Sequence, residues 1–120
     1  MKPIRINLPI RRGFSFYPFI IIPKRVVGTT NEIPYVAHET THWDRQGLTV
    51  LFWLFRYLTS TKFQMQEETI AFANEIRAYS KTDIDLNALI TTKANSMSHQ
   101  YNGMCTFDEA LTALRQELGQ

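Results

Sequence analysis

The segment HETTHWDRQG, residues 38–47, contains two histidines four residues apart, with a glutamate directly after the first. A helix is expected here, because Asn31 is a suitable N-terminal cap and Gly47 is a natural stop. Residues i and i+4 lie on the same face of a helix. His38 and His42 can therefore direct their rings at one cation, and the segment predicts a metal site built on a helix.

The spacing also assigns a role to Glu39, which lies about 100° round the helix from His38. Glu39 does not easily join the same set of ligands, but it can reach a water molecule on the metal, as in the H-E-x-x-H motif. Zinc accepts neutral imidazole nitrogen readily, whereas iron, cobalt and nickel also suit imidazole and carboxylate ligands. The alternative interpretation is a fortuitous pair of surface histidines.

A catalytic zinc needs a third protein ligand and an open coordination position. No histidine follows the motif before His99, so the third ligand is expected to be a carboxylate. A helix predicted over residues 66–80 offers Glu67, Glu68 and Glu75. Glu68 is the expected ligand and Glu67 remains an alternative. Glu75 is the second choice, or instead a partner that orients a histidine. Each of the three acids could also belong to a solvated helix face.

The rest of the chain predicts an α+β fold in one domain, residues 1–120. Residues 4–10 and 14–23 are rich in β-branched and aromatic residues and are expected to form a short β-hairpin or edge strand. A bundle of about four to five helices is expected to follow. The predicted helices after the first cover residues 48–59, residues 66–80, a segment from residue 83 or 85 to about residue 94, and a last segment ending near residue 119.

Two local patterns refine this expectation. Thr106 and Glu109 have the spacing of a capping box, which predicts the start of the last helix. Residues 96–104 are expected to form an irregular connection. The apolar run over residues 48–58 is too short to cross a membrane and contains Arg56, so it is expected to be a buried helix.

Composition excludes several classes of protein. The net charge is only +2, and the basic pairs Arg11–Arg12 and Lys24–Arg25 are expected on solvated faces, so no nucleic-acid partner is expected. No signal peptide and no membrane span are recognised. The chain has a single cysteine, Cys105, and therefore no intramolecular disulfide, which favours a reducing compartment such as the cytoplasm.

Two segments together resemble a known family. The pattern HETTHWDRQG, an aromatic-rich helix and then EETIAFANE resembles the small zincin-like metallopeptidase domains of bacteria and their phages, over about residues 14–80. The matching positions are His38, Glu39, His42 and Gln46 in the first segment and Glu68, Ala71 and Glu75 in the second. The resemblance implies a minimal zincin-like fold, in which His38, His42 and Glu68 hold Zn²⁺ and Glu39 is the general base.

The function expected is that of a zinc-dependent peptidase or amidase, in which a metal-activated water attacks a peptide carbonyl and Glu39 acts as general base. Its substrate would be a peptide or protein. Candidate donors to the developing oxyanion are His99, Tyr101 and Tyr79. The protein is expected in the cytoplasm of a bacterium or of a phage-infected cell, or in a virion.

The alternative expectation is a non-catalytic module, for example a component of a phage particle. In such a module the metallopeptidase fold would be kept as a structural or interaction part, and zinc would act as a staple. The presence of Glu39 favours catalysis, because a structural site has no use for a base.

Overall fold

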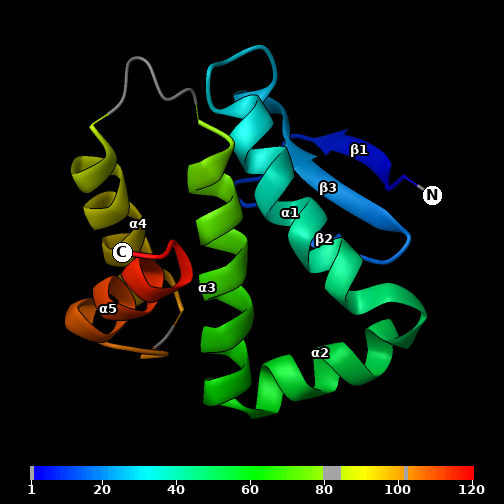
Figure 1. Ribbon diagram of the computed structural model, residues 1–120. Coiled ribbons are helices and arrows are strands. Elements are labelled where there is room, and N and C mark those ends of the chain that lie inside the picture. The colour runs from blue at the N-terminus through cyan, green and yellow to red at the C-terminus, as the bar shows by residue number, and fades with distance from the viewer. Residues whose placement is uncertain (1, 80–84, 102) are drawn as a thin grey trace.

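A computed structural model describes residues 2–79, 85–101 and 103–120, and within them the fold is α+β, as predicted (Figure 1). The strands are β1 (Ile4–Leu8), β2 (Phe14–Phe16) and β3 (Phe19–Pro23). The α-helices are α1 (Glu32–Gln46), α2 (Val50–Thr59), α3 (Thr61–Arg77), α4 (Leu86–Gln100) and α5 (Phe107–Glu117). Two 3₁₀ turns, η1 (Lys24–Val26) and η2 (Gly47–Thr49), precede α1 and α2.

The sheet has the strand order β1-β3-β2, with β2 antiparallel and β1 parallel to β3. The predicted run over residues 14–23 is split at Tyr17–Pro18, where the chain reverses and Phe16 pairs with Phe19. The hairpin therefore forms inside that run. β1 pairs with the remaining edge of β3, and the predicted hairpin between residues 4–10 and the later run is wrong.

Helix α1 covers the sheet and begins and ends at the predicted residues, but the Asn31 side chain does not cap it, and its Oδ1 accepts a hydrogen bond from the Tyr79 hydroxyl instead. Asn31 precedes its first residue, and Gly47 ends it with φ of 53°, in the left-handed region that favours glycine. Trp43 packs with three buried residues of β3 and η1, namely Ile20, Ile22 and Val26. This cluster fixes α1 against the sheet.

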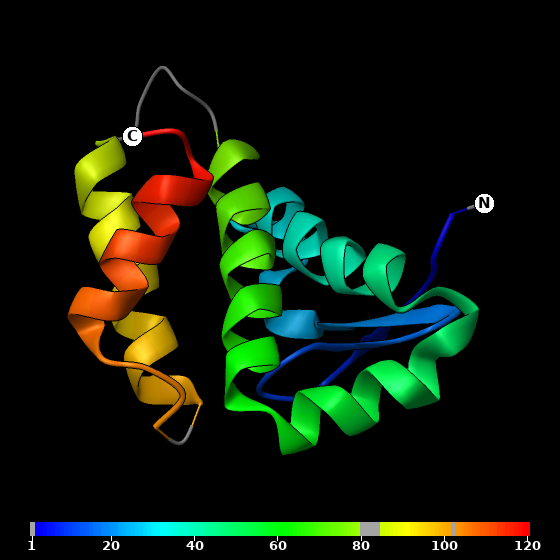
Figure 2. The ribbon, with the colours of Figure 1, turned by 60° about the horizontal axis from the view of Figure 1, so that its bottom comes forward.

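Helix α3 stands between the two parts of the fold, with the sheet, α1 and α2 on one side and α4 and α5 on the other (Figures 1 and 2). It begins five residues before the predicted residue 66, because the Ser60 hydroxyl accepts a hydrogen bond from Phe63 N and caps the helix. It ends at Arg77, and the predicted end at residue 80 lies outside the described residues.

Helices α4 and α5 pack on α3 through a second core cluster. Its buried members are Phe72, Ile76, Ile90, Ala94, Met97, Met104, Ala110 and Leu114. Helix α4 follows an Asp85 cap and continues to Gln100, so residues 96–100 are helical and not irregular as predicted. The predicted alternative start at residue 83 lies outside the described residues. The capping box of Thr106 and Glu109 is confirmed.

The prediction that α2 is buried is wrong. Within α2 only Trp53 is buried. Large apolar side chains of η2 and α2 are exposed, namely Leu48, Leu51, Phe52, Phe55 and Leu58. Trp53 Nε1 donates to Glu67 and the Tyr57 hydroxyl donates to Glu68, so the face of α2 that carries these two residues lies against α3 and the opposite face is exposed. No helix of the described segments is long and apolar enough to span a membrane.

Candidate metal centre

Helix α1 brings His38 and His42 together on its buried face. Both residues are buried, and their ring centroids lie 5.0 Å apart. The i, i+4 spacing produces this pairing, and the Phe72 and His38 rings pack edge to face with 4.4 Å between their centroids. The predicted pair thus has a fixed geometry in the interface between α1 and α3.

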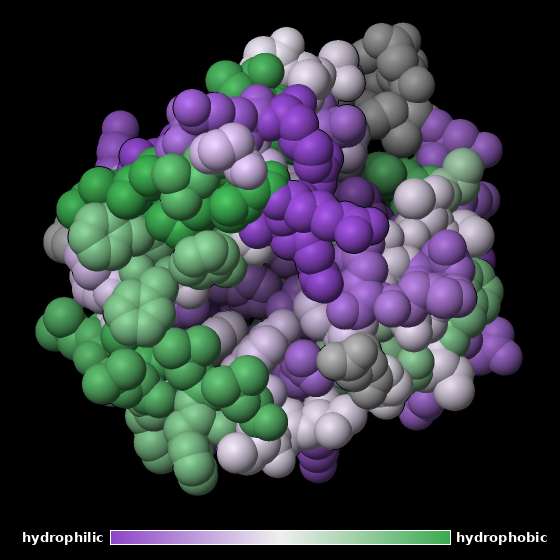
Figure 3. All heavy atoms as spheres, turned by 180° about the vertical axis from the view of Figure 1, so that it is seen from behind, coloured by the Kyte–Doolittle hydropathy of each residue, from purple (hydrophilic) through white to green (hydrophobic). Residues whose placement is uncertain are grey.

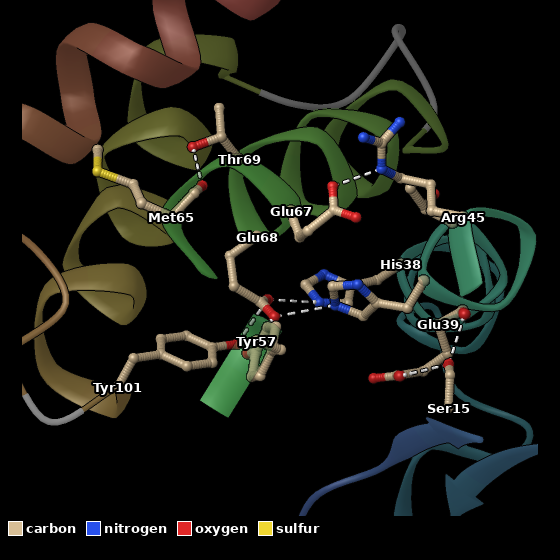
Figure 4. Close-up of polar contacts among 12 residues, drawn as sticks. Ser15, His38, Glu39, Arg45, Tyr57, Met65, Glu67, Glu68, Thr69 and Tyr101 are labelled. Atoms are coloured by element: carbon tan, nitrogen blue, oxygen red, sulfur yellow. Dashed lines mark hydrogen bonds and ion pairs between the residues drawn. The ribbon is translucent and has the colours of Figure 1, made fainter. Parts of the chain in front are cut away.

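Glu68 of α3 completes the group. Its Oε1 lies 3.1 Å from His38 Nε2 and its Oε2 lies 3.0 Å from His42 Nε2. One ligand atom from each of the three residues falls within 4.8 Å of the others. Tyr57 and Tyr101 donate hydrogen bonds to the same carboxylate, at 2.6 and 2.9 Å, and so hold it from the side opposite the histidines (Figure 4).

Glu67, the alternative ligand, does not join this group. Its carboxylate accepts hydrogen bonds from Arg45 Nε at 2.5 Å and from Trp53 Nε1 at 2.6 Å. Figure 4 shows the Glu67 side chain extending toward Arg45 while the Glu68 carboxylate meets the imidazoles. Glu67 therefore ties α3 to the end of α1 and to α2.

Glu75 contacts the other nitrogen of His38. Its Oε1 lies 2.8 Å from His38 Nδ1, and its Oε2 forms an ion pair with Lys93 Nζ of α4. A carboxylate on Nδ1 fixes the ring so that Nε2 points at Glu68. The structure thus places Glu75 in the orienting position that was its alternative prediction, and not beside the Nε2 atoms.

The chemistry of these donors fits a divalent cation such as zinc. Two imidazole nitrogens and a carboxylate oxygen are common zinc ligands, and three protein ligands leave one position open. His42 Nδ1 has no hydrogen-bond partner, which is exceptional among the buried side-chain nitrogens and oxygens of the described residues. His42 Nε2 contacts only Glu68 within the group. Apart from Glu68, no described side chain competes with a cation for His42 Nε2.

Mutual attraction dominates the electrostatics of the group. Burial lowers the pKa of His38, but its contacts with Glu68 and Glu75 outweigh burial and raise the pKa to about 10. Burial raises the pKa of Glu68, but His42 and His38 outweigh it and hold this pKa well below its ordinary value. An anionic carboxylate facing two imidazoles attracts positive charge, either a proton or a metal ion.

Glu39 lies beside the group, on the side of the sheet. It is buried, and Ser15 of β2 donates to its backbone oxygen at 2.6 Å and to its Oε1 at 2.9 Å (Figure 4). Burial raises the pKa of the Glu39 carboxyl, although His38 and His42 lower it in part. A carboxylate held in place with a raised pKa is suited to accepting and returning a proton.

The three predicted oxyanion donors lie in different places. Tyr101 contacts Glu68 within the group. Tyr79 donates to Asn31 Oδ1, and His99 is exposed beside Asn95 on α4. Of the three, only Tyr101 hydrogen-bonds to a residue of the group, while Tyr79 lines the cavity of about 410 Å³ that also includes His38.

The sequence reasoning missed four residues around the group, namely Ser15, Tyr57, Lys93 and Arg12. The i, i+4 spacing of Trp53 and Tyr57 marks one face of α2 and could have indicated Tyr57. Nothing in the spacing connects the others to the motif, because they come from β2, from α4 and from the segment between β1 and β2.

Two cavities meet at the candidate centre. One, of about 410 Å³, opens toward α4, and the other, of about 430 Å³, opens toward α2. Residues that line both cavities are Arg12, Gly13, His38, Glu39 and Tyr101. Figure 3 shows a hollow between two hydrophobic areas on the half of the molecule that carries the sheet and α2. His38 and Glu39 thus face space that a ligand could enter from two directions.

Comparisons with protein-family models, with curated proteins and with solved structures found no match to this chain.

Proposed function

We propose that this protein is a zinc-dependent peptidase or amidase related to the small zincin-like metallopeptidases. The observation that carries the proposal is the geometry of four side chains. His38, His42 and Glu68 converge at their ligand atoms, and Glu39, the residue following the first histidine, lines both cavities beside them. A converging ligand set next to a held carboxylate is the arrangement that metal-assisted hydrolysis requires.

Zinc, when bound, would polarise a substrate carbonyl and lower the pKa of a water molecule. Glu39 would take the proton of that water as it attacks and deliver it to the leaving amine. Ser15 keeps the Glu39 carboxylate in place for both transfers. Glu75 keeps His38 turned toward the cation.

The two tyrosines supply hydrogen-bond donors beside the reacting groups. Burial and the charge of Glu68 raise the pKa values of the Tyr57 and Tyr101 hydroxyls. Both phenols therefore keep their protons at neutral pH. Because Tyr101 also lines both cavities, it is the better placed of the two to turn its hydroxyl from Glu68 and donate to an oxygen that gains negative charge.

A second candidate function is a non-catalytic module, such as a component of a phage particle, with zinc as a staple. The observation that favours it is burial, because His38, His42 and Glu68 are only 2–6% exposed. A buried site of this kind connects α1 to α3 and would stabilise the fold when metal is bound. Glu39 has no part in such a role.

Metal analysis with a matched pair of variants tests the proposal. Purified wild type, Glu39→Gln and the surface control Glu117→Gln are each analysed for metal and then incubated with a pool of capped peptides read by mass spectrometry. We expect about one zinc per chain in all three proteins, with cleavage by wild type and by Glu117→Gln alone.

Each other result has a clear meaning. Zinc in all three proteins without cleavage of any peptide would contradict the peptidase and favour the staple. Wild type that stays free of metal in a zinc-containing buffer would contradict both candidates. Cleavage that persists in Glu39→Gln would contradict the assigned base.

A further inference from the structure

The cavity on the α4 side differs in charge from the one on the α2 side. Arg12, Arg25 and Lys93 contribute cationic groups to its wall, and Glu39 and Glu75 contribute acids. Glu75 is occupied by His38 and Lys93, and Glu39 is held by Ser15. The acids of the wall are therefore already engaged elsewhere.

The two arginines of this wall lack an acidic partner. Arg12 donates to the backbone oxygen of Gln100 at 3.3 Å, and its guanidinium lies 5.3 Å from the centroid of the Tyr101 ring. Arg25 donates to the backbone oxygen of Arg11 at 3.0 Å. In the part of the chain that the structure describes, neither guanidinium forms an ion pair with a carboxylate.

An arginine at the rim of a cavity is a preferred partner for a carboxylate, because its planar fork can donate two parallel hydrogen bonds. Here two such groups border one cavity of about 410 Å³. Polar groups such as Thr92, Ser96 and Gln100 also line it, which suits a charged ligand better than an apolar one. The wall thus has the charge and hydrogen-bonding capacity to bind an anion of small size.

The neighbouring cavity also has Arg12 in its wall, but it lacks Arg25 and Lys93 and is more apolar. Its wall carries apolar and aromatic side chains, namely Phe14, Phe16, Trp53, Leu54, Tyr57 and Leu58. The two cavities share His38 and Glu39, so a ligand that lies across the candidate centre would occupy both. One side of that ligand would meet cations and the other would meet apolar surface.

We propose that the cavity bordered by Arg12 and Arg25 binds a carboxylate of the substrate, either an acidic side chain or a free C-terminus, while the neighbouring cavity takes an apolar side chain. This inference rests on the proposed peptidase function and specifies its substrate class. Arg12 and Arg25 are specificity-determining residues in this account, and they take no part in the transfer of protons.

The inference is tested independently of catalysis by measuring how peptides bind to a variant that lacks the proposed general base. The full-length Glu39→Gln protein, loaded with zinc, is dialysed against three pools of hexapeptides containing Phe and Leu. The first pool is capped at both ends and contains Glu, the second is capped with Gln in place of Glu, and the third contains Gln and has a free C-terminus. Bound peptides are quantified by mass spectrometry.

We expect the Glu pool, the free C-terminus pool or both to bind about tenfold more tightly than the capped Gln pool, as a charge-assisted hydrogen bond can provide. The pool that is enriched identifies the source of the carboxylate. In the same background, Arg25→Gln and Arg12→Gln are expected to reduce the preference. The exposed Arg115→Gln removes the same charge from α5 and is expected to preserve it.

Equal binding of all three pools, absence of binding to any pool, or a preference that survives both Arg12→Gln and Arg25→Gln would overturn the inference. Failure of the proposed peptidase function can be distinguished from failure of the carboxylate site. Wild type that shows the preference but cleaves no peptide would contradict the peptidase alone, and wild type that cleaves neutral and acidic peptides equally would contradict the carboxylate site alone.

Discussion

His38 Nδ1 lies 2.8 Å from Glu75 Oε1, while the Nε2 atom of the same ring faces Glu68 at 3.1 Å. The imidazole is thus held between two buried carboxylates, one on each nitrogen. A carboxylate on the nitrogen that does not bind metal orients the ring and increases its basicity. The pairing makes Glu75 a positioning residue for the candidate centre.

Glu75→Gln is expected to weaken zinc binding by about 10- to 100-fold, because a neutral amide orients and polarises the ring less well than a carboxylate. Zinc affinity is measured by competition with a chromophoric chelator. Glu117→Gln, an exposed change of the same type, serves as the control and is expected to leave the affinity unchanged. Equal affinity in both variants would contradict the orienting role.

The adjacent acids Glu67 and Glu68 are expected to behave differently when each becomes glutamine. Glu68→Gln should lose most zinc binding, because it removes an anionic ligand. Glu67→Gln should retain zinc but lower the free energy of unfolding by about 1–3 kcal/mol, because its bonds to Arg45 and Trp53 are weakened. Urea unfolding and zinc titration of both variants check this, and loss of zinc from Glu67→Gln instead would reverse the assignment.

The stability of the zinc-free protein is expected to fall as the pH rises from about 6.5 toward 10. Burial lowers the pKa of His38, but Glu68 and Glu75 outweigh it and raise the folded-state pKa from 6.5 to about 10. Between these values the folded chain binds a proton that the unfolded chain releases, so stabilisation present below pH 6.5 is lost through this window.

Urea unfolding in the presence of a chelator, at several pH values between 6 and 10, measures this dependence. His38→Asn removes the titrating group and is expected to flatten the profile over the same range. A wild-type free energy of unfolding that stays constant or rises across the window would be inconsistent with the coupled contacts of His38.

Tyr101→Phe is expected to lower kcat by about 100-fold and to change KM little, because the lost donor acts on charge that develops during the reaction. Tyr57→Phe is the matched control, since Tyr57 contacts the same carboxylate but lines only the cavity on the α2 side. Steady-state kinetics on a cleaved peptide check both. A larger loss of kcat in Tyr57→Phe would move the donor role to that residue.

Local spacing was sufficient to predict the core of the candidate site. The i, i+4 pair placed His38 and His42 on one face of a predicted helix, and Glu68 and Glu75 were both among the acids expected to contact them. Pairing with more distant elements could not be predicted. The ion pair of Lys93 with Glu75 depends on how α4 packs, and no sequence spacing encodes that packing.

Two errors in the predicted fold have physical causes. Alternation of apolar residues does not distinguish parallel from antiparallel pairing, so the direction of β1 was missed. An apolar stripe is normally expected to face the core, but the run over residues 48–58 is apolar on all sides, so hydropathy does not select the face that is buried. The face that lies against α3 carries Trp53 and Tyr57, which donate to Glu67 and Glu68.

The most direct test of the central claim is an anomalous scattering map at the zinc absorption edge, from crystals of the full chain grown with zinc. We expect one strong peak about 2.0–2.2 Å from His38 Nε2, His42 Nε2 and a carboxylate oxygen of Glu68. A map without a peak among these three residues, or with zinc held only elsewhere, would contradict the account.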